Sequence, residues 1–134
     1  MNIQQPIIIF SVYETNKVKT SYHNKPNHEL AKNGLTGAGI PFKEVEGVYH
    51  GVKELSLIVD AVYEVTVQKL CQAHSQECYL YLHNDRYAEL RKPCGTLIGG
   101  LGYFKAAPKG STPIGDHTYD VQTDTYYYIS KAKS

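Results

Sequence analysis

Short segments in which apolar and polar side chains alternate at every second residue limit the fold of this chain more than any other feature. In residues 78–83, CYLYLH, the alternation places Cys78, Leu80 and Leu82 on one face of a strand and Tyr79, Tyr81 and His83 on the other. Similar alternation predicts strands over residues 42–49 and 54–60, joined by a bend near residues 50–53. The β-branched run IIIFSVY predicts a buried strand over residues 7–13.

Two segments between these strands have helical patterns. Lys25-Pro26-Asn27 predicts a helix start with Asn27 as the N-cap and Glu29 in the first turn. Gly34, Gly37 and Gly39, followed by Pro41, predict an early end to this helix. Residues 61–76 place apolar side chains at helical spacing, which predicts a second, amphipathic helix.

The predicted order β-α-β-β-α-β indicates an α+β protein with a ferredoxin-like sandwich, in which two helices cover one face of an antiparallel sheet. The last third of the chain is less regular. It contains the glycine-rich segment 95–104, a loop over residues 106–116, and a terminal hairpin around Thr123-Asp124. We interpret residues 1–134 as a single ferredoxin-like domain with a C-terminal β-hairpin extension.

A sheet covered on one face only would expose aromatic side chains on the other. Tyr79 and Tyr81, together with Tyr126 or Tyr128, would then form a large surface patch. Such patches mark self-association or ligand sites, so the pattern predicts an oligomer that forms through the open sheet face.

Charge and cysteine content exclude several classes of protein. Fourteen basic and thirteen acidic side chains give a net charge of +1, which argues against a nucleic-acid partner and favours a small, locally charged ligand. The three cysteines form no CxxC pair and the six histidines no HExxH motif, so we expect no metal site. Free thiols, the absence of a signal-like start and the absence of an apolar run of ~20 residues predict a soluble cytoplasmic protein without a membrane partner.

The hairpin between residues 47 and 59 contains the best candidates for chemistry. Tyr49 ends one predicted strand and Glu54 begins the next, and partners beside a short turn approach to roughly 5 Å at Cβ. Their side chains could share a hydrogen bond, although an exposed tyrosine beside a solvated charge explains the same spacing.

Two later segments are more ambiguous. The stretch GTLIGGLGYF matches neither phosphate-binding glycine motif, so it is a bulged connection or a loop that closes over a ligand. Asp85, Arg86 and Glu89 form a solvated loop or contact a ligand. We interpret Cys94 as a structural or incidental thiol.

Several short motifs, in order along residues 7–130, resemble those of the phage-encoded S-adenosylmethionine lyases, formerly described as S-adenosylmethionine hydrolases. The motifs are FSVYETNK, HNKPNHEL, a G-x-Y element at residues 47–49, a Glu-x-Ser strand entry at residues 54–56, QEC at residues 76–78, and PKG at residues 108–110. The family fold that this resemblance implies is ferredoxin-like and trimeric, with active sites between subunits.

The resemblance implies that Tyr49 and Glu54 belong to the catalytic site. Because the connection between them is shorter here than in the family, Glu44, Glu46 or Asp60 could instead supply the acidic group. By position alone, substrate binding is expected from His83, Asn84, Asp85, Gly99, Gly100 and Tyr103.

The implied activity is that of a carbon–sulfur lyase that needs no cofactor. It converts S-adenosyl-L-methionine to 5′-methylthioadenosine and L-homoserine lactone by intramolecular carboxylate attack, and it would deplete S-adenosylmethionine in the host cytoplasm as an anti-restriction function. Two other interpretations remain: a non-catalytic phage protein that binds a nucleotide or inhibits a host defence enzyme, and a structural phage protein.

Overall fold

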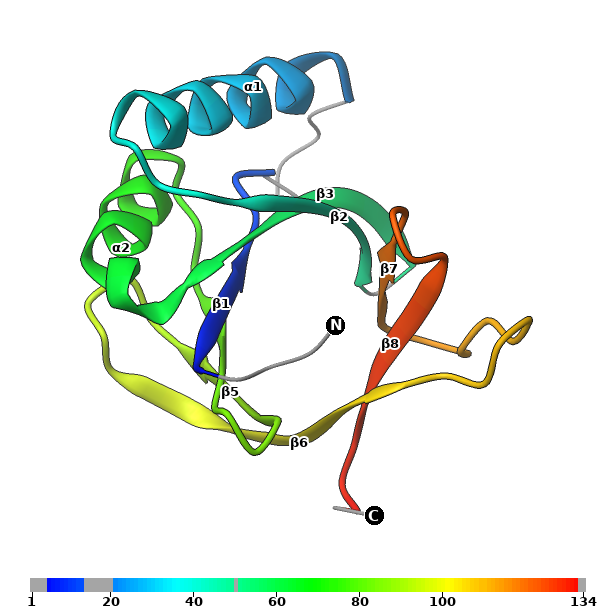
Figure 1. Cartoon of the computed structure of the whole chain (residues 1–134). Helices are drawn as coiled ribbons and strands as arrows, with labels where there is room; N and C mark the ends of the chain where they lie inside the picture. The colour runs from blue at the N-terminus through cyan, green and yellow to red at the C-terminus, as the bar shows by residue number, and fades with distance from the viewer. Residues whose placement is uncertain (1–4, 14–20, 50, 133–134) are drawn as a thin grey trace.

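A closed, antiparallel barrel of eight strands forms the body of the molecule (Figure 1). The computed structural model describes residues 5–13, 21–49 and 51–132, without the side chains of residues 21–24, 49 and 52. The strands are β1 (Ile7–Phe10), β2 (Lys43–Tyr49), β3 (Val52–Asp60), β4 (Tyr79–Leu82), β5 (Tyr87–Arg91), β6 (Leu97–Ala106), β7 (His117–Asp120) and β8 (Thr125–Ser130). The helices are α1 (Ser21–Gly37), the 3₁₀ turn η1 (Ala61–Tyr63) and α2 (Glu64–Ala73).

The strands are hydrogen-bonded in the order β1-β3-β2-β7-β8-β6-β5-β4, and β4 pairs with β1 to close the barrel. The predicted element order is correct from β1 to β4, but the predicted ferredoxin-like sandwich is wrong. Strands β7 and β5 pair with the two strands, β2 and β4, that would form the edges of an open sheet. Hydrogen bonding between β6 and β8 then completes the ring.

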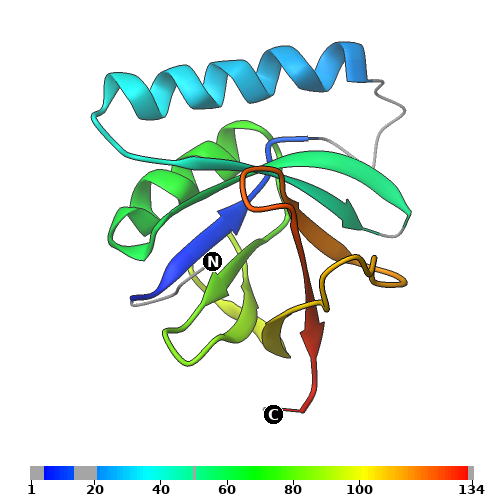
Figure 2. The same cartoon turned by 45° about the vertical axis from the view of Figure 1, so that its right-hand side comes forward.

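Alternation along the strands divides the apolar side chains between two cores. The outer core lies between the barrel wall and the two helices, which Figures 1 and 2 show on the same side of the barrel. It contains Ile8 and Phe10 of β1, Leu35 of α1 and Val67 of α2. The inner core fills part of the barrel with the alternate residues of the strands, such as Ile9, and with the stacked pair Phe104 and Tyr127.

Tyr79 and Tyr81 do not form the exposed aromatic face that was predicted. Tyr79 is 2% exposed and lies in the outer core, while Tyr81 packs against the same cluster. The opposite face of this part of the sheet is the interior of the barrel. The helices therefore cover the face that was predicted to be open.

Both helices differ in detail from the predictions. The second helix, expected over residues 61–76, is the 3₁₀ turn η1 followed by α2, which ends at Ala73. Helix α1 begins at Ser21, so Pro26 lies inside it and the prediction of Asn27 as the N-cap is wrong. Proline removes one backbone hydrogen bond, but it does not prevent the rest of a helix from forming when packing supports it. Helix α1 ends at Gly37, among the glycines predicted to end it, and Gly39 beyond it has a φ of +71°. Gly34, however, lies inside the helix, which has 17 residues. No helix among the described residues is long and apolar enough to cross a membrane.

The segments interpreted as loops after β4 are strands. Residues 87–91 form β5, and the glycine-rich segment forms most of β6, which has ten residues. Its glycines permit close packing: the Tyr87 hydroxyl lies where a Cβ of Gly100 would be, and a Cβ at Gly102 would collide with the Ser130 carbonyl oxygen. Gly102 also has a φ of +133°.

This packing predicts a large difference between two glycine substitutions in β6. Gly102→Ala introduces both a collision and an unfavourable φ, and we expect it to lower the free energy of unfolding by about 2–4 kcal/mol. Gly99→Ala is the matched control, because nothing lies within 4 Å of its added methyl group, and its effect should stay within about 1 kcal/mol. Urea denaturation measures both, and equal stabilities of the two variants would contradict the described packing.

Candidate functional site

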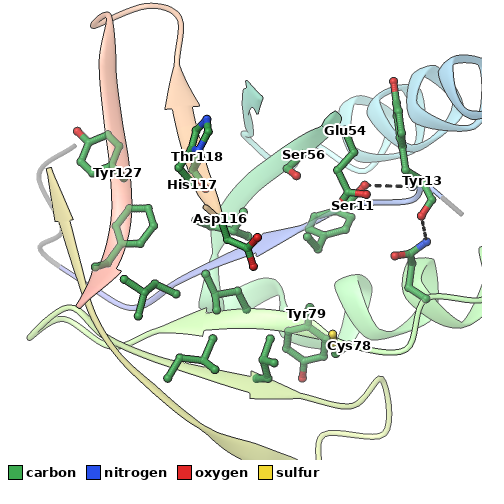
Figure 3. Close-up of a pocket in the computed structure, with 18 of the residues that line it drawn as sticks. Ser11, Tyr13, Glu54, Ser56, Cys78, Tyr79, Asp116, His117, Thr118 and Tyr127 are labelled. Carbon is green, nitrogen blue, oxygen red and sulfur yellow. Dashed lines mark hydrogen bonds between the residues drawn. The ribbon is translucent and has the colours of Figure 1, made fainter. Parts of the chain in front are cut away.

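A cavity of about 790 Å³ opens inside the barrel (Figure 3). Residues of β1, β3, β4, β5, β6, β7 and β8 line it, together with residues of the connections that follow β1, α2 and β6. Most of its wall is apolar and includes Leu80, Phe104 and Tyr127. Its lining residues with polar groups include Ser11, Tyr13, Glu54, Ser56, Ser75, Gln76, Glu77, Cys78, Tyr79, Asp116, His117, Thr118 and Tyr128. Cavities of roughly 300–1,000 Å³ with few polar groups are typical of sites for small molecules.

Glu54 places a half-buried carboxylate in this cavity. Its position on β3 pairs with Gly47 on β2, so no side chain stands opposite it across the ladder. Burial raises the pKa of Glu54 to about 7. Within the part of the chain that the structure describes, no cationic side chain pairs with this carboxylate. Glu54 therefore changes its charge near neutral pH. Perturbed pKa values of this kind are common among groups that bind a ligand or transfer a proton.

Tyr49 does not lie directly opposite Glu54. The register pairs Tyr49 with Val52 and Gly47 with Glu54, so the two residues are separated by two positions along the ladder. The Tyr49 side chain and all of His50, part of the predicted bend, lie outside the described residues. The hydrogen bond between Tyr49 and Glu54 stays a prediction.

The three alternative acidic groups do not line the cavity. Glu44 contacts the buried His28, with 2.6 Å between its Oε1 and the imidazole Nε2, and it also pairs with Lys32 at 3.5 Å. Glu46 lies 3.5 Å from the ammonium of Lys53.

The third alternative, Asp60, accepts a hydrogen bond from the backbone N–H of Val62 at the start of η1. Of the four acidic candidates in this region, only Glu54 lines the cavity.

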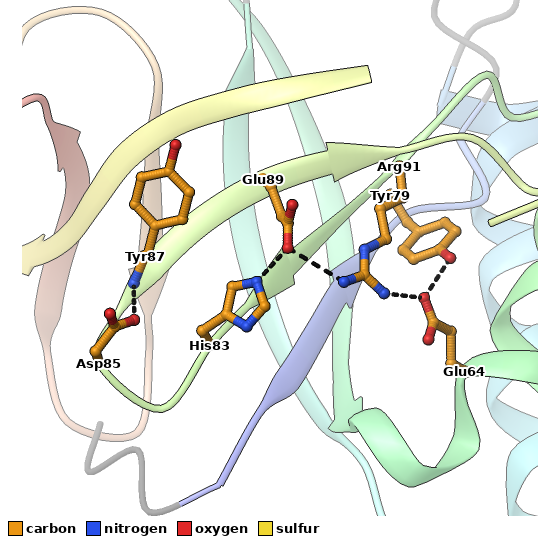
Figure 4. Close-up of polar contacts among 7 residues, drawn as sticks. All are labelled: Glu64, Tyr79, His83, Asp85, Tyr87, Glu89 and Arg91. Carbon is orange, nitrogen blue, oxygen red and sulfur yellow. Dashed lines mark hydrogen bonds and ion pairs between the residues drawn. The ribbon is translucent and has the colours of Figure 1, made fainter. Parts of the chain in front are cut away.

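The six residues predicted to bind substrate lie elsewhere. None of His83, Asn84, Asp85, Gly99, Gly100 and Tyr103 lines the cavity. The Asp85 carboxylate accepts a hydrogen bond from the Tyr87 N–H at 3.0 Å, and His83 pairs with Glu89 (Figure 4). The Tyr87 and Tyr103 rings meet edge to face, with centroids 5.4 Å apart. These residues stabilise β4, β5 and β6 and are separate from Glu54.

A network of charged side chains attaches α2 to the barrel wall, and the sequence analysis did not predict it (Figure 4). The Arg91 guanidinium donates to Glu64 at 2.8 Å and to Glu89 at 3.1 Å. It also lies 3.6 Å from the centre of the Tyr81 ring. The Tyr79 hydroxyl donates to Glu64 at 2.6 Å. Because this network fixes β4 from outside, it also fixes the part of the cavity wall that β4 provides.

Hydrogen bonds hold the rim of the cavity near Glu54. Ser11 Oγ donates to the Leu55 carbonyl and accepts from the Tyr13 N–H, both at 3.0 Å. The Gln76 side chain donates to the Tyr13 carbonyl at 2.5 Å, which joins the end of β1 to the connection before β4. These contacts fix the wall on both sides of the carboxylate.

Cys78 lies in the cavity as a protonated thiol at neutral pH. Burial, followed by the charges of Glu77 and Glu54, raises its pKa. All three cysteines are free, in agreement with the sequence analysis. Because a thiolate is the reactive form, Cys78 contributes a polar surface and not a nucleophile.

Sequence reasoning missed other polar residues of the cavity. Ser56 lies between Leu55 and Leu57 in β3, and Ser11 lies between Phe10 and Val12. A polar residue at an inward position of an otherwise apolar strand is the signal that could have identified both. No cluster of three or more potential metal ligands occurs among the described residues.

Comparison with known proteins identifies one family. The model of the S-Adenosylmethionine lyase family matches residues 10–130. No curated protein matches the chain at a significant level.

The burial of Glu54 predicts a specific dependence of stability on pH. Its pKa is about 7 in the folded state against an ordinary value of 4.5, so between these pH values the folded state binds more protons than the unfolded state. The free energy of unfolding should therefore fall as the pH rises through this window. Glu54→Gln removes this loss, so the variant should gain about 1–2 kcal/mol over the wild type above pH 7, after a discount for solvent screening.

Urea denaturation of both proteins at pH 4.5 and pH 8 measures the effect. The difference between variant and wild type should grow from the lower to the higher pH. A difference that is the same at both values would mean that Glu54 is solvated like an ordinary surface carboxylate.

Proposed function

Because the chain belongs to the S-adenosylmethionine lyase family, we propose that it cleaves S-adenosyl-L-methionine inside the barrel cavity to 5′-methylthioadenosine and L-homoserine lactone. The substrate carboxylate attacks the γ-carbon of its own methionyl chain. A carbon–oxygen bond forms, the carbon–sulfur bond breaks, and its electron pair goes to the sulfur. The reaction balances without a co-reactant, because the substrate supplies both the nucleophile and the leaving group.

The observation that carries this proposal is a half-buried carboxylate, without a cationic partner among the described residues, in a largely apolar cavity of ligand size. A zwitterionic, positively charged nucleoside matches both features. The apolar wall around Phe104 and Leu80 offers a surface for adenine, and Glu54 offers a partner for the substrate ammonium. This assignment does not use the six residues around His83 and Gly100.

The chain accelerates this reaction through geometry and exclusion of water. A folded methionyl chain holds the carboxylate oxygen behind the γ-carbon, and favourable orientation of this kind can contribute roughly 7–11 kcal/mol. In the transition state the negative carboxylate and the positive sulfonium neutralise one another. A water-poor cavity therefore favours the transition state over the separated charges of the bound substrate.

Glu54 binds the ammonium and not the sulfonium. A carboxylate against the sulfonium would stabilise the charge that disappears in the reaction, and so would slow cleavage. At the ammonium, it fixes the α-carbon and thereby the direction of the neighbouring substrate carboxylate. Tyr49 orients Glu54 through its hydroxyl in this proposal.

Association of three chains, with the site between neighbouring subunits, is part of the proposal because the family resemblance implies it. Three apolar side chains at the cavity, Leu101, Ile114 and Ile129, are at least 36% exposed. A neighbouring copy that covers them would shield the site from water. Sedimentation of the purified protein should give three times the mass of one chain, and a monomer would refute this part.

The biological role we propose is depletion of S-adenosylmethionine in a phage-infected cell. Restriction enzymes and methyltransferases that need this metabolite would then lose activity. Expression of the active protein should raise the plating efficiency of unmodified phage on a restricting host, and an inactive variant should not.

Glu54→Gln tests the catalytic assignment. We expect it to remove at least 99% of the methylthioadenosine formed from S-adenosylmethionine, as measured by chromatography, because the substrate ammonium loses its anionic partner. The fold should persist, since no described side chain pairs with Glu54. Glu46→Gln is the matched control on the outer face of the same hairpin and should retain normal turnover. Full activity of Glu54→Gln would refute the assignment.

Tyr49→Phe should reduce the rate more mildly, by about tenfold, because it removes one orienting hydrogen bond and no charge. The same chromatographic assay measures the rate. A loss of activity that occurs only together with unfolding, as seen by circular dichroism, would argue against a catalytic role for Tyr49. Complete recovery of S-adenosylmethionine from the wild-type protein would favour the non-catalytic nucleotide-binding interpretation.

A further inference from the structure

The cavity has a closed end inside the barrel. Along β4 and β5, Leu80 and Leu90 line the cavity, whereas the next inward residues, Leu82 and Ala88, do not. Leu80 pairs with Leu90 and Leu82 with Ala88, so the boundary lies at the same register on both strands. Ile58 of β3 also lies beyond the cavity, and these three side chains beyond the boundary are at most 7% exposed. Packed side chains therefore fill the barrel past this level.

Two stacked aromatic rings stand at this closed end. Phe104 of β6 and Tyr127 of β8 belong to the inner core, line the cavity and are each 2% exposed (Figure 3 labels Tyr127). Their ring centroids lie 5.0 Å apart and their planes are inclined by 5°. Thr125, the neighbouring residue on the same face of β8, does not line the cavity. The rings therefore form the part of the closed end that β6 and β8 provide.

A buried ion pair lies behind the rings. Asp120 is fully buried and pairs with Lys43, and neither residue lines the cavity. The register places Thr118 opposite Tyr127 and Asp120 opposite Thr125, so Asp120 lies one inward position beyond the rings. The stacked rings therefore separate the space open to a ligand from this ion pair.

Electrostatic effects on Tyr127 agree with this position. Burial, followed by the negative charge of Asp120, raises the pKa of Tyr127, while the positive charges of Lys43 and Arg86 act in the opposite direction. A ligand that pushed the rings aside would disturb the ion pair between Lys43 and Asp120, and breaking a buried pair is strongly unfavourable. The rings are therefore a fixed boundary of the cavity.

From this arrangement we propose that Phe104 and Tyr127 are specificity-determining residues, whose stacked rings set the size of the largest base that the cavity accepts. The choice of an adenosyl base as the ligand group at the rings rests on the proposed function. The ring faces are carbon and hydrogen, so selection by them depends on shape and not on hydrogen bonds. In a closely packed interior, an added methyl group on the base edge that faces the rings has no space to occupy.

Four uncharged nucleosides test the size limit by isothermal titration. They are 5′-methylthioadenosine and its derivatives with one methyl group on N6, on C2 or on C8, so that each open edge of the base is enlarged in one ligand. The wild-type protein should bind 5′-methylthioadenosine and should bind at least one methylated derivative weaker by roughly tenfold or more. Phe104→Leu should restore most of that loss, because leucine is smaller than phenylalanine and leaves room for a methyl group.

Two further variants assign the gain to the rings. Phe42→Leu is the matched control, because Phe42 packs against the outer core and does not line the cavity. It makes the same substitution and should leave the size limit unchanged. Tyr127→Leu removes the other ring and should also admit the excluded derivative, so it tests the same boundary if circular dichroism shows that Phe104→Leu does not fold. A general loss of structure cannot produce tighter binding of a larger ligand.

Three results would overturn the proposal. Equal affinity of the wild type for all four nucleosides would show that the rings set no size limit. A gain that is absent from Phe104→Leu and Tyr127→Leu, or equally large in Phe42→Leu, would place the limit elsewhere. Failure of the wild type to bind 5′-methylthioadenosine would show that the rings do not face an adenosyl base.

The size limit and the proposed cleavage can fail separately. If S-adenosylmethionine is recovered intact while the affinities follow the predicted order, the cleavage is wrong and the size limit stands. If methylthioadenosine accumulates from S-adenosylmethionine while all four nucleosides bind equally, the size limit is wrong and the cleavage stands.

Discussion

Closure of the β-sheet is the constraint on which the other features of this protein depend. Strands β5–β8 connect the two edges of the β4-β1-β3-β2 sheet, so the face away from the helices becomes an interior. Alternation along β3 then directs Leu57 and Val59 under the helices and Glu54 and Ser56 into the barrel. An open sheet would leave Glu54 in water, where burial would not raise its pKa. The perturbed carboxylate is therefore a consequence of the topology.

Glu54 is treated differently from the carboxylates on the outside of the barrel. Outside, Glu44 contacts His28, and Glu64 and Glu89 share Arg91. These pairs attach helices to the wall and satisfy their charges. Inside, Glu54 has no such partner among the described residues.

A chain with nearly equal numbers of acidic and basic groups could have neutralised Glu54 in the same way. An unfavourable, unpaired group in a cavity is the arrangement expected where a ligand provides the missing charge.

Local patterns predicted the local elements well. The alternation in residues 78–83 and the apolar run at residues 7–13 correctly indicated β4 and β1, because side-chain periodicity is a property of each segment alone. The prediction failed where pairing between distant segments decides the result. Pairing of β2 with β7, some 70 residues later in the chain, cannot be inferred from either segment by itself. The glycine-rich segment predicts a bulged connection or a loop. In the structure Gly100 and Gly102 lie within β6, where the close approach of Tyr87 and Ser130 leaves no room for a side chain.

The site was predictable only in part for the same reason. Family resemblance singled out Glu54, and the structure locates it in the cavity. Ser56 and Thr118 line the same cavity from strands that meet only when the barrel closes. His83 was chosen because it follows a predicted strand and Gly100 because it belongs to the glycine-rich segment, but neither residue lines the cavity.

The most direct test of the account is a crystal structure of the protein with sinefungin, which resembles S-adenosylmethionine but cannot be cleaved. The account predicts that the ligand lies inside the barrel, with an ammonium within hydrogen-bond distance of the Glu54 carboxylate. A ligand bound at the outer wall near His83 and Tyr103, with Glu54 in contact with solvent alone, would contradict it.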